Sequence, residues 1–263
     1  MFEIIKRTKA FLFDLDGTIY LDDVLIGDVK NTLNKLRDNG ITVAYLTNNS
    51  SKTDDEYLEK LKRIGIYDER DVFYSSLDGA VDYLNFYHKD LTVYPVATKE
   101  VVNHLEKEGI KVVKTGEIAD IVLLTFDKEL DYQKIVWANY LMVKGAKYFA
   151  THPDAVCPAK DVNIPDLGSF IEMFKKSSKR EPDLIIGKPY TIMADNIMRK
   201  LNLSKDQVTM VGDRLHTDIA FGVNSGINTI LVLSGESTLE LAKTHPVKAD
   251  LILQDVNEIV KHL

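Results

Sequence analysis

The chain has 263 residues, a length typical of one or two domains and sufficient to bury a large core. Hydrophobic residues make up 45% of it and charged residues 28%, a globular composition that excludes wholesale disorder. Because there are 33 basic and 40 acidic residues, the net charge is −7, and the basic footprint of a nucleic-acid-binding protein is absent from the sequence.

No targeting or membrane signal is visible in the sequence. Residues 1–10 carry several charges and no long apolar stretch, so they do not resemble a signal peptide. No apolar run approaches the roughly 20 residues of a membrane span. The single cysteine, Cys157, cannot form an internal disulfide. These features predict a cytoplasmic protein that does not associate with membranes.

Short apolar runs alternate with amphipathic helical stretches from the start of the chain. Residues 10–13 predict a strand buried on both faces, and residues 29–36 predict a helix that Gly40 ends. A second strand is expected over residues 41–46. The capping box that begins at Thr53 then opens another helix.

The middle of the chain repeats this alternation as a separate module. Strands are expected over 92–97, 121–126 and 147–151, and helices over 100–107 and 132–143. A loop from His152 to Gly168 follows. We therefore expect a smaller α/β domain, residues 78–180, inserted into the core.

The last third of the chain returns to strands that are apolar throughout. These are expected over 184–186, 208–211, 229–233 and 251–253. Strands of this kind alternating with helices predict a doubly wound α/β core with a parallel sheet, formed by residues 1–77 and 181–263.

Polar groups follow four of the predicted core strands. In open α/β sheets ligands bind outside the carboxyl ends of the strands, so these groups are the candidates for a site. They are Asp14–Thr18, Thr47–Asn49, Gly187–Pro189 and Gly212–Asp218.

Asp14 and Asp16 point the same way if strand geometry continues through them. Such a pair either binds a hard cation such as Mg²⁺ or divides into an ionised nucleophile and a protonated acid. Gly17 allows a sharp turn beside the pair, and Thr18 can donate to an anion. A plain strand-end turn is the alternative, because Asp-Gly is a frequent turn dipeptide.

Further acids and a lysine favour the chemical interpretation. Asp213 and Asp218 can converge on the same sheet edge, and acids held together need a cation and a lysine nearby to stay ionised. Lys188 is such a lysine, while Thr47 and Asn48 are neutral donors suited to phosphate oxygens. This combination fits phosphoryl transfer through an aspartyl-phosphate.

These residues also carry a family resemblance. Asp14–Thr18 matches the DxDGT signature of the haloacid dehalogenase superfamily, and the other three groups resemble its later motifs. The TNNSS and GKP forms and the long insertion are similar to subclass IIA, the NagD-like and 4-nitrophenylphosphatase-like phosphatases. Residues 151–154 resemble the T-N-P-D segment of that subclass, with His152 where asparagine is common.

The resemblance implies a role for each matching residue. Asp14 would be the nucleophile and a Mg²⁺ ligand. Asp16 would be the general acid and base, with its backbone carbonyl on the metal. Asp213 and Asp218 would complete the metal site, Asp218 directly or through water, and Lys188 would offset the phosphoryl charge. The remaining matches would bind phosphate or substrate: Gly17, Thr18, Thr47, Asn48, Asn49, His152 and Asp154.

The implied activity is Mg²⁺-dependent hydrolysis of small phosphate monoesters such as sugar phosphates, nucleoside monophosphates and aryl phosphates, by a monomer or homodimer whose cap closes over the substrate. A phosphotransferase or mutase would use the same intermediate. A regulator that only binds phosphorylated ligands is a third possibility. A dehalogenase is disfavoured by Asp16, because carbon–halogen cleavage has no leaving alkoxide that needs an acid.

Overall fold

The computed structural model describes residues 2–157 and 162–263, which form two compact units. The core unit comprises Met1–Thr47, Asp54–Tyr74 and Lys188–Leu263, and the inserted unit comprises Asn48–Thr53 and Ser75–Gly187. Part of the predicted loop from His152 to Gly168, namely residues 158–161, lies outside the described residues. Among the residues described, no helix is long and apolar enough to cross a membrane.

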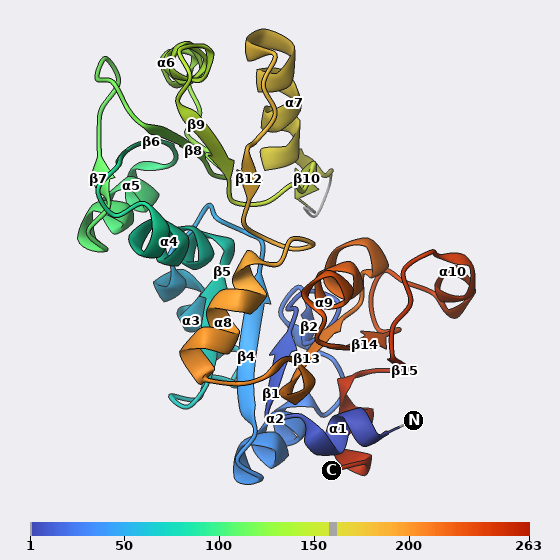
Figure 1. Cartoon of the computed structure of the whole chain (residues 1–263). Coiled ribbons are helices and arrows are strands. Elements are labelled where there is room, and N and C mark those ends of the chain that lie inside the picture. The colour runs from blue at the N-terminus through green and yellow to red at the C-terminus, as the bar shows by residue number, and fades with distance from the viewer. Residues whose placement is uncertain (1, 158–161) are drawn as a thin grey trace. The chain divides into compact units, whose positions relative to one another are not determined.

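A six-stranded sheet forms the centre of the core unit (Figure 1). Its order is β15-β14-β13-β1-β4-β5, and the pairings of β1 with β4 and β13, and of β14 with β13 and β15, are parallel. The strands are β1 (Ala10–Phe13), β4 (Thr42–Thr47), β5 (Val72–Ser75), β13 (Val208–Gly212), β14 (Asn228–Val232) and β15 (Leu251–Leu253). A short antiparallel hairpin, β2 (Tyr20–Leu21) and β3 (Val24–Leu25), follows β1.

Helices bury the core sheet on both faces. Phe11 and Phe13 pack in one apolar cluster with Val29 and Leu33 of α2, while Leu12, which alternates with them along β1, is also fully buried. The helices are α1 (Glu3–Arg7), α2 (Val29–Asp38), α3 (Asp54–Arg63), α8 (Ile192–Leu201), α9 (Ala220–Ser225) and α10 (Leu239–Thr244), with 3₁₀ turns over Lys205–Gln207 and Val256–Lys261 and a π-helical turn over Leu215–Ile219. The predicted doubly wound α/β core is confirmed.

The strand order reverses between β1 and β13. From β1 the chain proceeds through β4 to β5 on one side, and later through β13, β14 and β15 on the other. Ligands of such sheets bind at this switch point, outside the carboxyl ends of the strands. Asp14 and Asp213 are the residues that directly follow β1 and β13.

The inserted unit is a second α/β structure with its own apolar core. Its five-stranded sheet has the order β12-β9-β8-β6-β7, and all four pairs of neighbouring strands are parallel. The strands are β6 (Thr92–Val96), β7 (Lys111–Val112), β8 (Ile121–Leu124), β9 (Lys147–Ala150) and β12 (Leu184–Ile185), with a separate pair β10 (Val156–Cys157) and β11 (Ile164–Pro165). The helices are α4 (Ser76–Tyr87), α5 (Lys99–Lys107), α6 (Tyr132–Val143) and α7 (Leu167–Ser178).

One strand lies in a different sheet from the one we predicted. The apolar run 184–186 was expected in the core sheet, but β12 is an edge strand of the inserted sheet, where Leu184 pairs with Phe149 of β9. A short apolar run carries no information about its partner strand, so only the tertiary fold decides the sheet to which it belongs.

Candidate active site

Three carboxylates converge at the switch point of the core sheet. Asp14 follows β1, Asp213 follows β13, and Asp218 lies in the π-helical turn Leu215–Ile219. Each offers an oxygen, and these oxygens all lie within 4.8 Å of one another. The backbone N–H of Arg214 donates to Asp218 Oδ2 at 3.1 Å and fixes that carboxylate. The structure thus brings together three of the four predicted metal-binding residues, and the side chain of the fourth, Asp16, is outside this group.

Lys188 is buried and contacts two of these acids. Its side chain is 2% exposed, and its Nζ lies 2.5 Å from Asp14 Oδ1 and 2.8 Å from Asp218 Oδ1. Burial opposes the ammonium charge, but the attraction of Asp14 and Asp218 outweighs it and raises the pKa of Lys188. The lysine is therefore a permanent cation at the predicted site.

Burial raises the pKa of each acid in the group. Loss of hydration, followed by repulsion from Asp218, raises the pKa of Asp14 to about 6, although Lys188 acts in the opposite direction. Burial and the charge of Asp14 raise the pKa of Asp213 to about 6, and burial likewise raises that of Asp218. The charges of Lys188 and Arg214 do not fully compensate three crowded carboxylates, so the group favours a further cation.

A divalent metal ion fits this group of residues. Asp213 Oδ2 accepts the N–H of Glu236 at 2.7 Å, whereas Oδ1 is buried and has no hydrogen-bond partner in the described part of the chain. A buried carboxylate oxygen without a partner is costly unless a cation or water satisfies it. Carboxylate oxygens are the ligands that hard divalent cations prefer. Asp14, Asp213 and Asp218 together can hold such an ion.

Asp16 differs from the other acids in its surroundings. Asp16 is a solvent-exposed residue. The surrounding protein nevertheless removes enough hydration to raise the pKa of its carboxyl to about 6, although the charge of Lys60 acts in the opposite direction. A carboxyl with this pKa is partly protonated near neutral pH. It can both give and take a proton, as a general acid and base must.

Gly17 leaves room for Asp213. Its backbone has φ +83°, and a Cβ added there would lie 2.5 Å from Asp213 Oδ2. Thr18, the next residue, is fully buried, and its Oγ1 has no hydrogen-bond partner among the residues described. The close approach of the Asp213 carboxylate therefore requires glycine at position 17 in the turn after β1.

Alanine at position 17 is expected to displace Asp213 and weaken binding of a divalent cation roughly tenfold or more, because changing a residue that contacts a metal ligand typically alters metal affinity by about 10- to 100-fold. Gly40→Ala is the matched control, since Gly40 has φ +71° but nothing within 4 Å of its added Cβ. Both variants carry backbone strain, so the contact with Asp213 is the difference between them. Isothermal calorimetry with Mg²⁺ measures it, and equal affinities in the two variants would contradict the expectation.

The predicted phosphate-binding residues divide between the two units. Thr47 is the last residue of β4 in the core unit, whereas Asn48 and Asn49 belong to the inserted unit. Asn48 Nδ2 donates to Asp154 Oδ2 at 3.0 Å, so two of the predicted residues contact each other. Asn49 Oδ1 accepts from the backbone N–H of Ser51 at 2.9 Å and stabilises the turn after β4.

His152, predicted from the sequence to bind substrate, lies buried inside the inserted unit. Its ring is fully buried. Nε2 lies 3.0 Å from Asp166 Oδ1, and Nδ1 lies 3.2 Å from Thr151 Oγ1. Because both ring nitrogens have partners in the inserted unit, we do not assign His152 a direct role in binding.

A fifth strand end contributes residues that the sequence analysis did not consider. The loop after β14 brings Ser234 Oγ to the carbonyl of Gly17, at 2.7 Å, and the N–H of Glu236 to Asp213. A Cβ on Gly235 would lie 2.0 Å from Asp213 Oδ2. The sequence does indicate this loop, because Ser-Gly-Glu directly follows the strand predicted over residues 229–233, as the other polar groups follow their strands.

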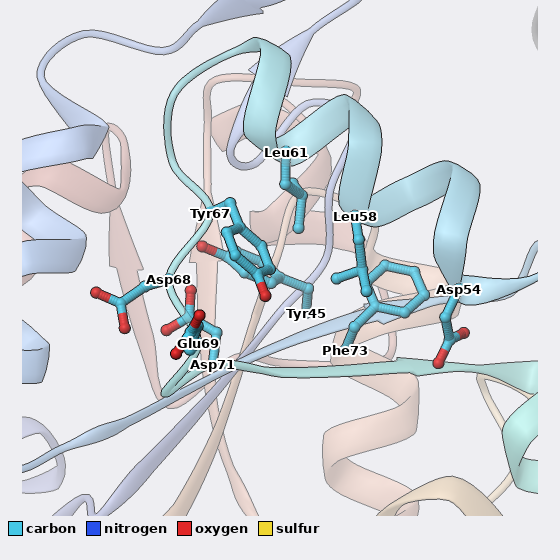
Figure 2. Close-up of a pocket in the computed structure, with 9 residues that line it drawn as sticks. All are labelled: Tyr45, Asp54, Leu58, Leu61, Tyr67, Asp68, Glu69, Asp71 and Phe73. Atoms are coloured by element: carbon cyan, nitrogen blue, oxygen red, sulfur yellow. The ribbon is translucent and has the colours of Figure 1, made fainter.

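A separate cavity lies between α3 and β5 in the core unit. Figure 2 shows Leu58 and Leu61 of α3 above the rings of Tyr45 and Phe73. Its other lining residues are Asp54, Tyr67, Asp68, Glu69 and Asp71. Two of its acids already have cationic partners, because Arg37 binds Asp71 and Arg70 binds Asp68. None of the predicted site residues lines this cavity.

Comparisons with known proteins agree with this geometry. The sequence model for haloacid dehalogenase-like hydrolases matches residues 11–111, and a second model of HAD-hydrolase-like sequences matches residues 185–259. The acid sugar phosphatase of Staphylococcus epidermidis is 33% identical over 258 residues, which are 98% of this chain and 99% of that protein.

Solved structures show the same likeness. The 4-nitrophenylphosphatase of Thermotoga maritima has 34% sequence identity and a TM-score of 0.93, with 98% of each chain covered. A protein described as NagD is also 34% identical, with a TM-score of 0.89 over 97% of this chain and 98% of that one. This chain therefore belongs to the haloacid dehalogenase-like hydrolases, among the NagD-like phosphatases that hydrolyse phosphoric monoesters.

Proposed function

We propose that the protein hydrolyses small phosphate monoesters through an aspartyl-phosphate on Asp14, with Mg²⁺ held by Asp14, Asp213 and Asp218. The observation that carries this proposal is the convergence of these three carboxylates, within 4.8 Å, around a buried lysine at the switch point of the sheet. The carbonyl of Asp16 is proposed as a further ligand from the motif it belongs to. When bound, the cation supplies positive charge that stabilises the transferring phosphoryl group.

The residues of the chain then carry two displacements at phosphorus. An oxygen of Asp14 attacks, so that a bond from Asp14 to phosphorus forms as the bond from phosphorus to the leaving oxygen breaks. Asp16 gives its proton to the leaving oxygen. As a carboxylate it then takes a proton from the water that attacks phosphorus, and inorganic phosphate and free Asp14 result.

Lys188 has a constant role in both steps. Its ammonium group contacts Asp14 at 2.5 Å, which favours the ionised form that a nucleophile requires. The same charge offsets that of the phosphoryl group. Thr18, Thr47, Asn48 and Asn49 are proposed, from the motifs they form, to donate hydrogen bonds to phosphate oxygens.

Substrate choice is assigned to the inserted unit, proposed here as the specificity cap. The core residues named above recognise only phosphate and metal, so selectivity must come from elsewhere in the chain. The names of two relatives, an acid sugar phosphatase and a 4-nitrophenylphosphatase, favour sugar phosphates and aryl phosphates as substrates.

The test is phosphate release from 4-nitrophenyl phosphate with Mg²⁺, followed by a screen of phosphorylated metabolites at a fixed Mg²⁺ concentration. Activity should disappear in excess chelator and return when Mg²⁺ is restored. Full activity in the chelator would contradict the metal-dependent mechanism. Adding sugar acceptors tests the phosphotransferase alternative, since transfer would yield a new phosphate ester in place of inorganic phosphate.

Metal binding is expected to stabilise the protein more at pH 8 than at pH 5. In the metal-free protein the pKa values of Asp14 and Asp213 are raised to about 6, above the ordinary 3.8, so folding favours their protonated forms. Their contribution to stability is therefore present at low pH and lost as the pH rises through 6. Below pH 6 a cation must displace protons to bind.

Thermal unfolding with and without Mg²⁺ at the two pH values measures this difference. Asp213→Asn is the matched variant, because the amide keeps the bond from Glu236 but has no charge. It should raise the free energy of unfolding of the metal-free protein at pH 8 by on the order of 2 kcal/mol. It should also abolish most of the Mg²⁺-induced stabilisation. A Mg²⁺ effect that is larger at pH 5 would contradict this account.

A further inference from the structure

A chain of buried hydrogen bonds crosses the inserted unit. Ser50 Oγ lies 2.7 Å from Thr151 Oγ1, which lies 3.2 Å from His152 Nδ1. On the other side of the imidazole ring, Nε2 lies 3.0 Å from Asp166 Oδ1. Ser50, Thr151 and His152 are fully buried, and Asp166 is 5% exposed. A buried polar network of this kind is stable when each of its groups has a hydrogen-bond partner.

The two ends of this chain fix the direction in which its hydrogens point. At one end the backbone N–H of Phe126 donates to Ser50 Oγ at 2.9 Å, so the serine hydroxyl is left to donate onward. At the other end the Asp166 carboxylate accepts from Leu167 N at 2.6 Å and is free to accept from the ring. We therefore assign the ring hydrogen to Nε2. The Thr151 hydroxyl then donates to Nδ1 at 3.2 Å, which is closer than its other acceptor, the Leu124 carbonyl at 3.5 Å.

The Ser–His–Asp order is not a second nucleophilic site. A serine nucleophile must reach its substrate and pass its proton to the histidine. Ser50 is fully buried, its oxygen accepts from Phe126, and its separation from His152 Nδ1 is 3.4 Å. The arrangement is therefore suited to holding segments in place.

The segments that it holds are the two connections next to proposed active-site residues. The chain passes between the units at four points, and two of them, Thr47–Asn48 and Gly187–Lys188, include proposed active-site residues. The N–H of Gly187 donates to the carbonyl of Thr151 at 2.7 Å, and a Cβ at Gly187 would lie 2.5 Å from Asn48 Oδ1 and 3.1 Å from His152 Cβ. Gly187 is thus packed against both Asn48 and the Thr151–His152 segment within the inserted unit, and it links the two connections.

Asn48 itself is held from two further sides. Its carbonyl accepts from Ser76 Oγ at 2.5 Å, and its side-chain amide donates to Asp154, two residues after His152. The N–H of Gly168 in α7 donates to the carbonyl of Asp154 at 2.7 Å. The orientation of Asn48 therefore depends on the same loop that His152 joins to Ser50.

We infer that His152 is a positioning residue that fixes Asn48 and the two connections through Ser50 and Thr151, an inference that rests on the proposed phosphatase function. The Nδ1 side of the ring orients the connections. The Nε2 side anchors the loop to Asp166 at the start of α7. The two ring nitrogens thus have separable roles, and each can be removed without the other.

Two isosteric variants separate these roles. In His152→Asn the amide occupies the position of Nδ1, which keeps the contact with Thr151 but removes the ring donor from Asp166, leaving that carboxylate only the bond from Leu167 N. In His152→Gln the amide reaches the position of Nε2, which keeps Asp166 but loses the contact with Thr151. We expect kcat with 4-nitrophenyl phosphate to stay within about threefold of wild type in the first variant and to fall roughly 10- to 100-fold in the second.

Thermal stability should follow the opposite order. His152→Asn should lower Tm more than His152→Gln. In His152→Asn the buried Asp166 carboxylate loses a charge-assisted bond, whereas in His152→Gln the hydroxyls of Ser50 and Thr151 can still pair with each other. Ser169→Ala is the matched control. Its hydroxyl donates to the carbonyl of Ala155 at 2.7 Å in the same loop but has no contact with the buried chain, so kcat should not change.

The outcomes are distinguishable from failure of the proposed function. If the wild-type protein releases no phosphate, the proposed function fails. If wild type is active and kcat follows Tm across the variants, or stays unchanged in His152→Gln, the positioning role is overturned. Nitrogen NMR of histidine-labelled protein tests the donor direction separately, and a ring hydrogen found on Nδ1 would contradict it.

Discussion

Asparagine at position 14 is expected to reduce phosphate release by on the order of 10³-fold or more, because removal of a nucleophile leaves only binding and electrostatic stabilisation. The amide has nearly the same shape as the carboxylate but cannot form the covalent intermediate. Steady-state turnover of 4-nitrophenyl phosphate measures the loss.

The same substitution should not damage the fold. Burial and the charge of Asp218 raise the pKa of Asp14 to about 6, so its ionised form is unfavourable in the folded protein without metal. At pH 8 the metal-free Asp14→Asn variant should therefore be at least as stable as wild type, while Lys188 keeps its bond to Asp218. An inactive variant with a lowered Tm would point to unfolding as the cause and contradict this explanation.

Methionine at position 188 is expected to abolish activity and to destabilise the protein as well. Lys188 is 2% exposed and contacts Asp14 and Asp218, and removal of one partner from a buried ion pair costs about 3–5 kcal/mol. With the lysine gone, repulsion between the two acids is no longer offset, and their pKa values should rise further. Chemical denaturation in the presence of a chelator measures the loss of stability.

Lys188→Arg provides the control for charge. The guanidinium keeps the positive charge but is larger and planar, so it should restore more of the stability than of the activity. If Lys188→Met were as stable as wild type in the chelator, the two ion pairs would contribute nothing to the folded state. That result would contradict the electrostatic account of the site.

The core and its acids were predictable because strand ends are local sequence features. The buried strand before Asp14 and the one before Asp213 are continuous apolar runs, and parallel strands place their carboxyl ends at one edge. The side-by-side placement of β1 and β13 follows once the sheet is doubly wound. Lys188 was predicted from the need for a positive charge beside the clustered acids. In the structure it is buried and contacts Asp14 and Asp218.

Other features depended on tertiary contacts that no local pattern contains. The apolar run at residues 184–186 fits either sheet, and its pairing with Phe149 is decided by the fold of the inserted unit. His152 was predicted to bind substrate because it lies in the segment that resembles T-N-P-D, at the position where asparagine is common. Its actual partner, Asp166, is 14 residues away and was not distinguishable from other loop acids in the sequence.

In the proposed mechanism the phosphoryl group passes through a covalent bond to Asp14. Asp16→Asn should slow hydrolysis of the intermediate more than its formation from 4-nitrophenyl phosphate, whose leaving group needs little acid assistance. Mass spectrometry of this variant after rapid acid quench, with peptide mapping, detects the covalent intermediate. We predict one added phosphoryl group on the peptide that contains Asp14, and its absence in Asp14→Asn. Turnover by the wild-type enzyme with no adduct in the trapped variant, or an adduct on a different residue, would contradict the mechanism.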